Sequence, residues 1–104
     1  MLEDMEPSPA CNLPAADYRK RLAWIDELNS TALRGYRRLG RHIELRYDPC
    51  AADLVREFVR GERECCPFLG FTLRETRNAI IVWIEVPEDL SDAADDLFAP
   101  YTRS

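Results

Sequence analysis

The chain has 104 residues, a length that suits one domain and lets roughly two-thirds of the unfolded surface be buried. Its apolar content of 46% and aromatic content of 10% predict a globular protein and exclude disorder along the whole chain. The formal net charge of −5 argues against a general nucleic-acid binder, and no apolar run approaches the roughly 20 residues that span a bilayer.

The first segment, residues 1–10, is acidic, contains two prolines and offers little to bury. We expect it to be a flexible N-terminal tail, and residues 11–104 to form a single domain. The segment lacks the basic and apolar regions of a secretory signal, so the sequence predicts a cytoplasmic protein. In that reducing compartment the four cysteines are expected to be thiols and not disulfides.

A helix is expected over residues 14–29, because a proline stands at its first position and apolar residues recur at helical spacing. Residues 31–47 then predict a β-hairpin that turns at Gly40, since residues 42–47 alternate polar and apolar. Residues 32–34 leave a second interpretation open, in which they extend the helix.

The second helix has a strong start signal. Asp48 suits the N-cap and Pro49 the first helical position, and Pro67 ends the helix near Cys66. Its apolar stripe consists of these residues: Ala51, Leu54, Val55, Phe58, Val59 and Cys65.

A second hairpin is expected to join residues 71–76 to residues 79–86, and a short helix to follow Pro87. The second arm is apolar on both faces up to Trp83, which predicts a central strand covered on both sides, with Trp83 buried. The order α-β-β-α-β-β-α predicts an α+β fold in which helices pack on a four-stranded antiparallel sheet.

Basic residues concentrate between positions 19 and 46, and acidic residues between positions 85 and 96. We interpret these stretches as solvated faces that attract each other within one chain or between the copies of a homodimer. A local anion or RNA site on the basic stretch is the alternative, although nucleic acid and membranes are not expected as partners of the whole chain.

The four cysteines are the most reactive side chains, and helix geometry divides them. Cys50 and Cys65 stand at opposite ends of one helix, about 22 Å apart at 1.5 Å per residue, so they cannot share an ion. Cys11 precedes a different helix and is free to approach either end. One site can therefore hold Cys11 with Cys65 and Cys66, or Cys11 with Cys50. Cys50 by itself is expected to face solvent.

Thiolates select soft or borderline ions, so three of them suit Hg(II) or As(III), or zinc with a fourth ligand. The spacing is not that of a zinc finger, since the chain has no Cys-x-x-Cys and its one histidine, His42, alternates onto the polar side of its strand. A soft-ion site open to solvent is the favoured interpretation. The structural alternative makes Cys65 a small buried hydrophobic residue and Cys66 a chance neighbour.

Residues 62–71, Glu-Arg-Glu-Cys-Cys-Pro-Phe-Leu-Gly-Phe, together with Cys11-Asn-Leu, resemble a pattern found in small bacterial proteins linked with heavy-metal and mercury resistance. The similarity runs from Cys11 to Val86, and its specific part is short. The resemblance implies that Cys11, Cys65 and Cys66 belong to one metal site, and it gives Cys50 no place.

Three functions follow from these features. The first is heavy-metal handling or sensing, in which clustered thiolates bind a soft metal or metalloid without turnover. The second is a thiol enzyme, either a redox protein that cycles Cys65 and Cys66 or a lyase on an organometal that adds the carboxylate of Glu62 or Glu64. The third is a structural domain that self-associates through its charged faces. We favour the first, which is not an enzyme.

Overall fold

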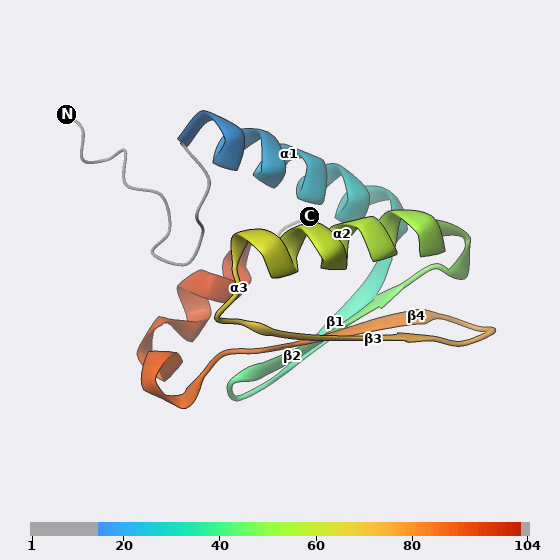
Figure 1. Ribbon diagram of the computed structural model, residues 1–104. Coiled ribbons are helices and arrows are strands. Elements are labelled where there is room, and N and C mark those ends of the chain that lie inside the picture. The colour runs from blue at the N-terminus through green and yellow to red at the C-terminus, as the bar shows by residue number, and fades with distance from the viewer. Residues whose placement is uncertain (1–14, 103–104) are drawn as a thin grey trace.

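The computed structural model describes residues 15–102 (Figure 1). Its helices are α1 (Ala15–Ala32), α2 (Ala52–Cys65) and α3 (Ala94–Thr102), and its strands are β1 (Leu33–Leu39), β2 (His42–Tyr47), β3 (Gly70–Glu75) and β4 (Ile80–Glu85). Short 3-10 helices, η2 (Pro49–Ala51) and η3 (Glu88–Ala93), lead into α2 and α3. The predicted α+β class and the order α-β-β-α-β-β-α are confirmed.

The four strands form one antiparallel sheet in the order β1-β2-β4-β3. Each hairpin pairs consecutive strands, and β2 joins the hairpins by pairing with β4. Gly40 turns the first hairpin with a φ of 63°, a left-handed conformation that favours glycine. The central place of β4 agrees with its apolar sequence.

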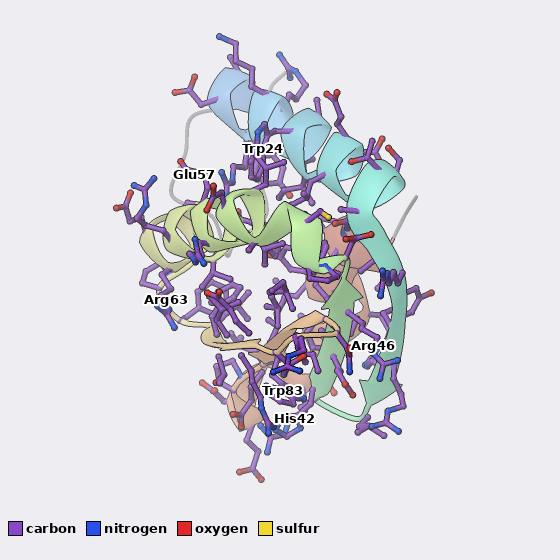
Figure 2. The ribbon with its side chains drawn as sticks, turned by 90° about the vertical axis from the view of Figure 1, so that its right-hand side faces the viewer. Trp24, His42, Arg46, Glu57, Arg63 and Trp83 are labelled. Atoms are coloured by element: carbon purple, nitrogen blue, oxygen red, sulfur yellow. The ribbon has the colours of Figure 1, made fainter. Side chains whose placement is uncertain are left out.

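All three helices lie on one side of the sheet, with α2 over the strands and α1 beyond α2 (Figures 1 and 2). Alternate side chains of the two central strands point into this layer and are buried. They are Ile43, Leu45, Tyr47, Ile80, Val82 and Ile84. The core therefore lies between the sheet and the underside of α2.

The prediction that both faces of the central strand are covered, with Trp83 buried, is wrong. Trp83 is only half-buried, and Figure 2 shows it with His42 on the side of the sheet that faces away from α1 and α2. Trp83 stands opposite Glu44 on one neighbouring strand and Thr72 on the other. An apolar run on both faces of a strand does not reveal whether helices cover both, and here the helices cover one.

The element boundaries differ modestly from those expected. Helix α1 continues to Ala32, and β1 begins at Leu33. Of residues 32–34, which the second interpretation added to the helix, only Ala32 belongs to it. Asp48 is an N-cap as expected, and its Oδ1 accepts a hydrogen bond of 2.8 Å from the Cys50 backbone N–H, although the first turn is 3-10 and α2 begins at Ala52.

The expected tail, residues 1–10, lies outside the described residues, so its separation from the domain 11–104 stays a prediction. Among residues 15–102, none of the helices has the length and apolar character that a membrane span requires.

Asn29 is the buried polar residue that joins the layers. The Tyr47 hydroxyl donates to Asn29 Oδ1 over 2.7 Å, and Asn29 Nδ2 donates to the Tyr101 carbonyl over 2.8 Å. These two bonds connect α1 to β2 and to α3. Asn29 therefore lies inside α1 and does not end it, because its amide is satisfied by other elements.

Replacing Asn29 with alanine should lower the free energy of unfolding by about 2–4 kcal/mol, because it leaves a buried hydroxyl and a buried carbonyl without partners. Ser30→Ala is the matched control, since Ser30 is exposed on the same helix and bonds only to the Glu27 carbonyl. Urea unfolding measures both. Equal stabilities for the two variants would contradict the role given to Asn29.

The unfolding free energy should also fall in alkaline solution. Burial, aided by the Glu62 carboxylate, raises the pKa of Tyr47 above the ordinary value of 10.0. The folded protein therefore keeps a phenolic proton that the unfolded chain loses above pH 10, so this contribution is complete below pH 10 and declines as the pH rises further.

Tyr47→Phe should reduce that decline by up to about 1.4 kcal/mol per pH unit, the value for one proton. Urea unfolding between pH 9 and 11 measures the slope, and Tyr36→Phe is the control because Tyr36 is 52% exposed. If the slope in Tyr47→Phe equals that of the wild type, burial does not shift the titration of the Tyr47 hydroxyl, and the prediction is wrong.

Candidate metal centre

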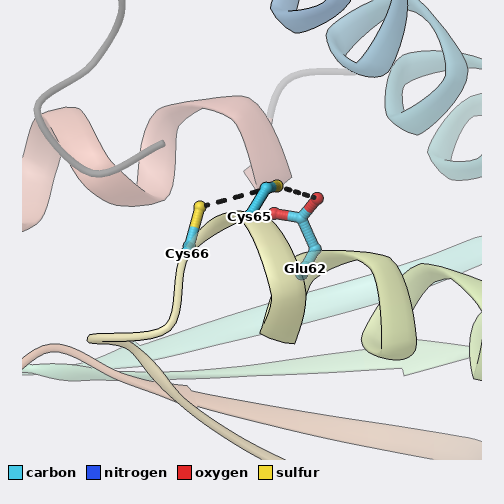
Figure 3. Close-up of side chains that lie close together, drawn as sticks. All are labelled: Glu62, Cys65 and Cys66. Carbon is cyan, nitrogen blue, oxygen red and sulfur yellow. Dashed lines mark hydrogen bonds between the residues drawn. The ribbon is translucent and has the colours of Figure 1, made fainter. Parts of the chain in front are cut away.

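Two adjacent thiols lie at the end of α2, over the sheet and close to α3 (Figure 3). Cys65 is the last residue of the helix and Cys66 is its C-cap, so the chain leaves the helical path between them. Their Sγ atoms are 3.9 Å apart, and each residue is only 6% exposed. The expectation of a site open to solvent is wrong for this pair, because both thiols face the packed helices.

Glu62 completes a cluster with the two thiols. It is 3% exposed, it stands three residues before Cys65 on α2, and its Oε2 lies 3.8 Å from the Cys65 Sγ, which donates to it. One ligand atom from each of the three residues lies within 4.8 Å of the others. A carboxylate and two thiols thus converge in a buried space.

The Glu62 carboxylate is compensated by two other helices. Arg21 of α1 donates through Nε to Oε2 over 2.6 Å, and Tyr101 of α3 donates through its hydroxyl to Oε1 over 2.5 Å. Arg21 also donates through Nη2 to the Phe58 carbonyl over 2.9 Å, and its Cζ lies 4.9 Å from the centroid of the Trp24 ring. A buried charge needs such partners, and Glu62 has a cation and a hydroxyl.

The Tyr101 hydroxyl acts as a donor in this network. Burial raises the pKa of Tyr101 well above its ordinary value, and the nearby Glu62 carboxylate raises it further. The phenol therefore keeps its proton at neutral pH and remains available to Glu62.

Gly61 explains how the Arg21 guanidinium reaches Glu62. A Cβ atom on Gly61 would lie 2.6 Å from Arg21 Nη2 and 2.8 Å from its Cζ, closer than real contacts allow. Glycine inside a helix costs about 1 kcal/mol relative to alanine. Here it leaves the space in which the guanidinium of α1 crosses the surface of α2.

The structure brings together two of the three predicted ligands. Cys65 and Cys66 are neighbours as expected, whereas Cys11 lies outside the described residues and its place in the site stays a prediction. Cys50 is exposed at the start of α2, as expected, and α2 separates it from the pair.

From the sequence, Glu62 was expected only as one of two carboxylates for a lyase and not as part of the metal site. Glu64, the other, is exposed. The signal for Glu62 was present, because residues three apart on a helix share a face and Cys65 belongs to the apolar stripe.

The separation of the sulfur atoms fits a three- or four-coordinate ion. With metal–sulfur bonds of about 2.3 Å, two thiolates stand about 3.8 Å apart at a tetrahedral angle, about 4.0 Å at a trigonal angle and about 4.6 Å when linear. The observed 3.9 Å lies between the first two values. The donor set of two sulfurs and one oxygen suits a borderline or soft ion.

No protein-family model matches the chain, and neither a curated protein nor a solved structure matches it.

Gly61→Ala should lower the free energy of unfolding by about 1–3 kcal/mol, although alanine is the better helix former. The methyl group displaces the flexible Arg21 side chain, so the cost is the loss of the cation beside the buried carboxylate.

A double-mutant cycle tests this cause. In a Glu62→Gln background no carboxylate needs the guanidinium, so Gly61→Ala should there be neutral or stabilising in chemical denaturation. The same loss in both backgrounds would place its cause elsewhere than in the ion pair.

Proposed function

We propose that the protein binds a soft or borderline metal or metalloid ion, Hg(II), As(III) or Zn(II), and serves in heavy-metal handling or sensing. The observation that carries this proposal is the buried pair of sulfur atoms 3.9 Å apart beside the Glu62 carboxylate. Cys11 is proposed as a third thiolate, a role that rests on the sequence pattern and on no contact in the structure.

Ion binding is favoured over redox cycling of the two thiols. Consecutive Cα atoms across a trans peptide are about 3.8 Å apart, whereas disulfides usually join Cα atoms about 4.4–6.8 Å apart. Residues 15–102 contain no cis peptide bond. A disulfide within the pair would therefore need a rearranged backbone, while an ion between the sulfurs needs none.

The hydrogen bonds of Glu62 support a direct part for its carboxylate. A carboxylate offers about four lone-pair sites, and Arg21, Tyr101 and Cys65 occupy three of them. Ion binding takes the proton from the Cys65 thiol, so the bond from this thiol to Oε2 is lost. That oxygen then has a lone pair to offer an ion held by the thiolates.

Replacing either Cys65 or Cys66 with serine should weaken Hg(II) or arsenite binding by orders of magnitude, because a hydroxyl is a poor ligand for a soft ion. Titration calorimetry gives the affinities, and native mass spectrometry of reduced protein gives the stoichiometry. Cys50→Ser is the matched control, since Cys50 is an exposed cysteine at the far end of α2.

Stability measurements on the same variants separate the proposal from a purely structural role. If Cys65 has only a structural role in the core, Cys65→Ser should lower the free energy of unfolding by roughly 1–3 kcal/mol, and the ion affinity should stay as in the wild type. Wild-type affinity in a Cys65→Ser/Cys66→Ser variant would end the proposal.

Two further variants distinguish the ions. As(III) is satisfied by three thiolates, so its binding should depend on Cys11 and little on Glu62. A borderline ion such as Zn(II) accepts carboxylate oxygen, so its binding should weaken in Glu62→Gln. Cys11→Ser and Glu62→Gln, each titrated with both ions, therefore show which ligands complete the site.

A further inference from the structure

The face of the sheet that the helices leave uncovered is organised in rows of side chains that cross the strands. One row contains Gly35, Arg46, Ile81 and Arg74. The next row contains Arg37, Glu44, Trp83 and Thr72. On a chain with a net charge of −5, these two rows hold three arginines and one glutamate.

A hollow of about 670 Å³ lies on this face, where β1 begins, β2 ends and the β3–β4 turn approaches. Its volume lies within the range of about 300–1,000 Å³ that is typical of small-ligand sites. Arginines from β1 and β2 line it, together with the apolar residue Ile81 and the polar residues Thr76 and Asn78.

Arg46 supplies a cation that none of the residues 15–102 neutralises. Among the described residues its side chain has no ion pair or hydrogen bond. The other two arginines of the hollow are held in place, because Arg34 contacts Asp48 at 3.2 Å and Arg37 contacts Glu44 at 3.0 Å. The hollow therefore combines one free guanidinium with two fixed ones.

Gly35 keeps the hollow open. A Cβ atom on Gly35 would meet nothing within 4 Å, and the glycine stands directly opposite Arg46 on the neighbouring strand. Its φ is not positive, so the backbone does not require glycine at this position. What glycine leaves there is space beside the free guanidinium.

We propose that this hollow binds a phosphate-bearing small molecule of nucleotide size. Guanidinium groups pair with phosphate oxygens through charge-assisted hydrogen bonds, and Arg46 offers such a group without first breaking an ion pair. Ile81 provides apolar surface for a ring, and the Asn78 side chain provides hydrogen-bond partners. The site is separate from the thiols, which lie on the other side of the sheet.

Adenosine 5′-monophosphate is a suitable probe, titrated into the full chain and followed by amide shifts in two-dimensional NMR. We expect shifts around Gly35, Arg46 and Asn78 and none around Cys65. Arg46→Ala should weaken binding roughly tenfold, the worth of one charge-assisted contact to phosphate. Arg19→Ala is the matched control, because Arg19 is exposed on α1 and is likewise unpaired among the described residues.

Gly35→Val tests the space without changing the charge. Valine suits a strand, so the variant should fold, and its side chain should occupy the space beside Arg46 and weaken binding of the nucleotide. Unchanged binding in Gly35→Val, or equal weakening by Arg46→Ala and Arg19→Ala, would refute the site.

Two further probes test the size and class of the ligand. Inorganic phosphate should bind at least tenfold more weakly than the nucleotide, and equal affinity would refute the assignment of nucleotide size. A single-stranded oligoribonucleotide that binds across Trp83 while the mononucleotide does not bind would instead identify a nucleic-acid surface. Neither result depends on the metal proposal, because Cys65→Ser/Cys66→Ser should bind the nucleotide as the wild type does.

Discussion

The contact between Arg21 and Glu62 holds together the part of the molecule in which the candidate metal site lies. A carboxylate that is 3% exposed is costly to bury alone, and its cation comes from a residue 41 positions earlier in the chain. The contact fixes α1 against α2, and Tyr101 brings α3 to the same carboxylate. The thiols of Cys65 and Cys66 are enclosed because these three helices meet at Glu62.

The local patterns in the sequence predicted most of the fold. Alternation on β2, the Asp48–Pro49 helix start and the position of Gly40 are each determined by neighbouring residues, and the structure agrees with them. The prediction for Trp83 was wrong because an apolar side chain does not indicate which face of the sheet the helices cover. That depends on how the helices pack together, which no short segment determines.

In the candidate site, too, neighbouring residues could be predicted from the sequence, whereas contacts between helices could not. The sequence identified the adjacent thiols, and the spacing of Glu62 from Cys65 could have added the carboxylate. Arg21 could not have been found, because its pairing depends on the crossing of α1 over α2 and on the space that Gly61 leaves. The charge concentrations were visible in the sequence, but the free guanidinium of Arg46 was not, since pairing between strands decides which arginines are neutralised.

The enclosure of the two thiols has a consequence for the timing of ion exchange. Because Cys65 and Cys66 are each 6% exposed, the proposed ion would reach both sulfurs only when the packing of the helices opens locally. The open state is present for only a small fraction of the time, so the rate of opening would limit the rates at which the ion is bound and released. If the proposed ion binding is correct, the site should release its ion slowly, as a store or a long-lived signal does, and should be poorly suited to rapid buffering.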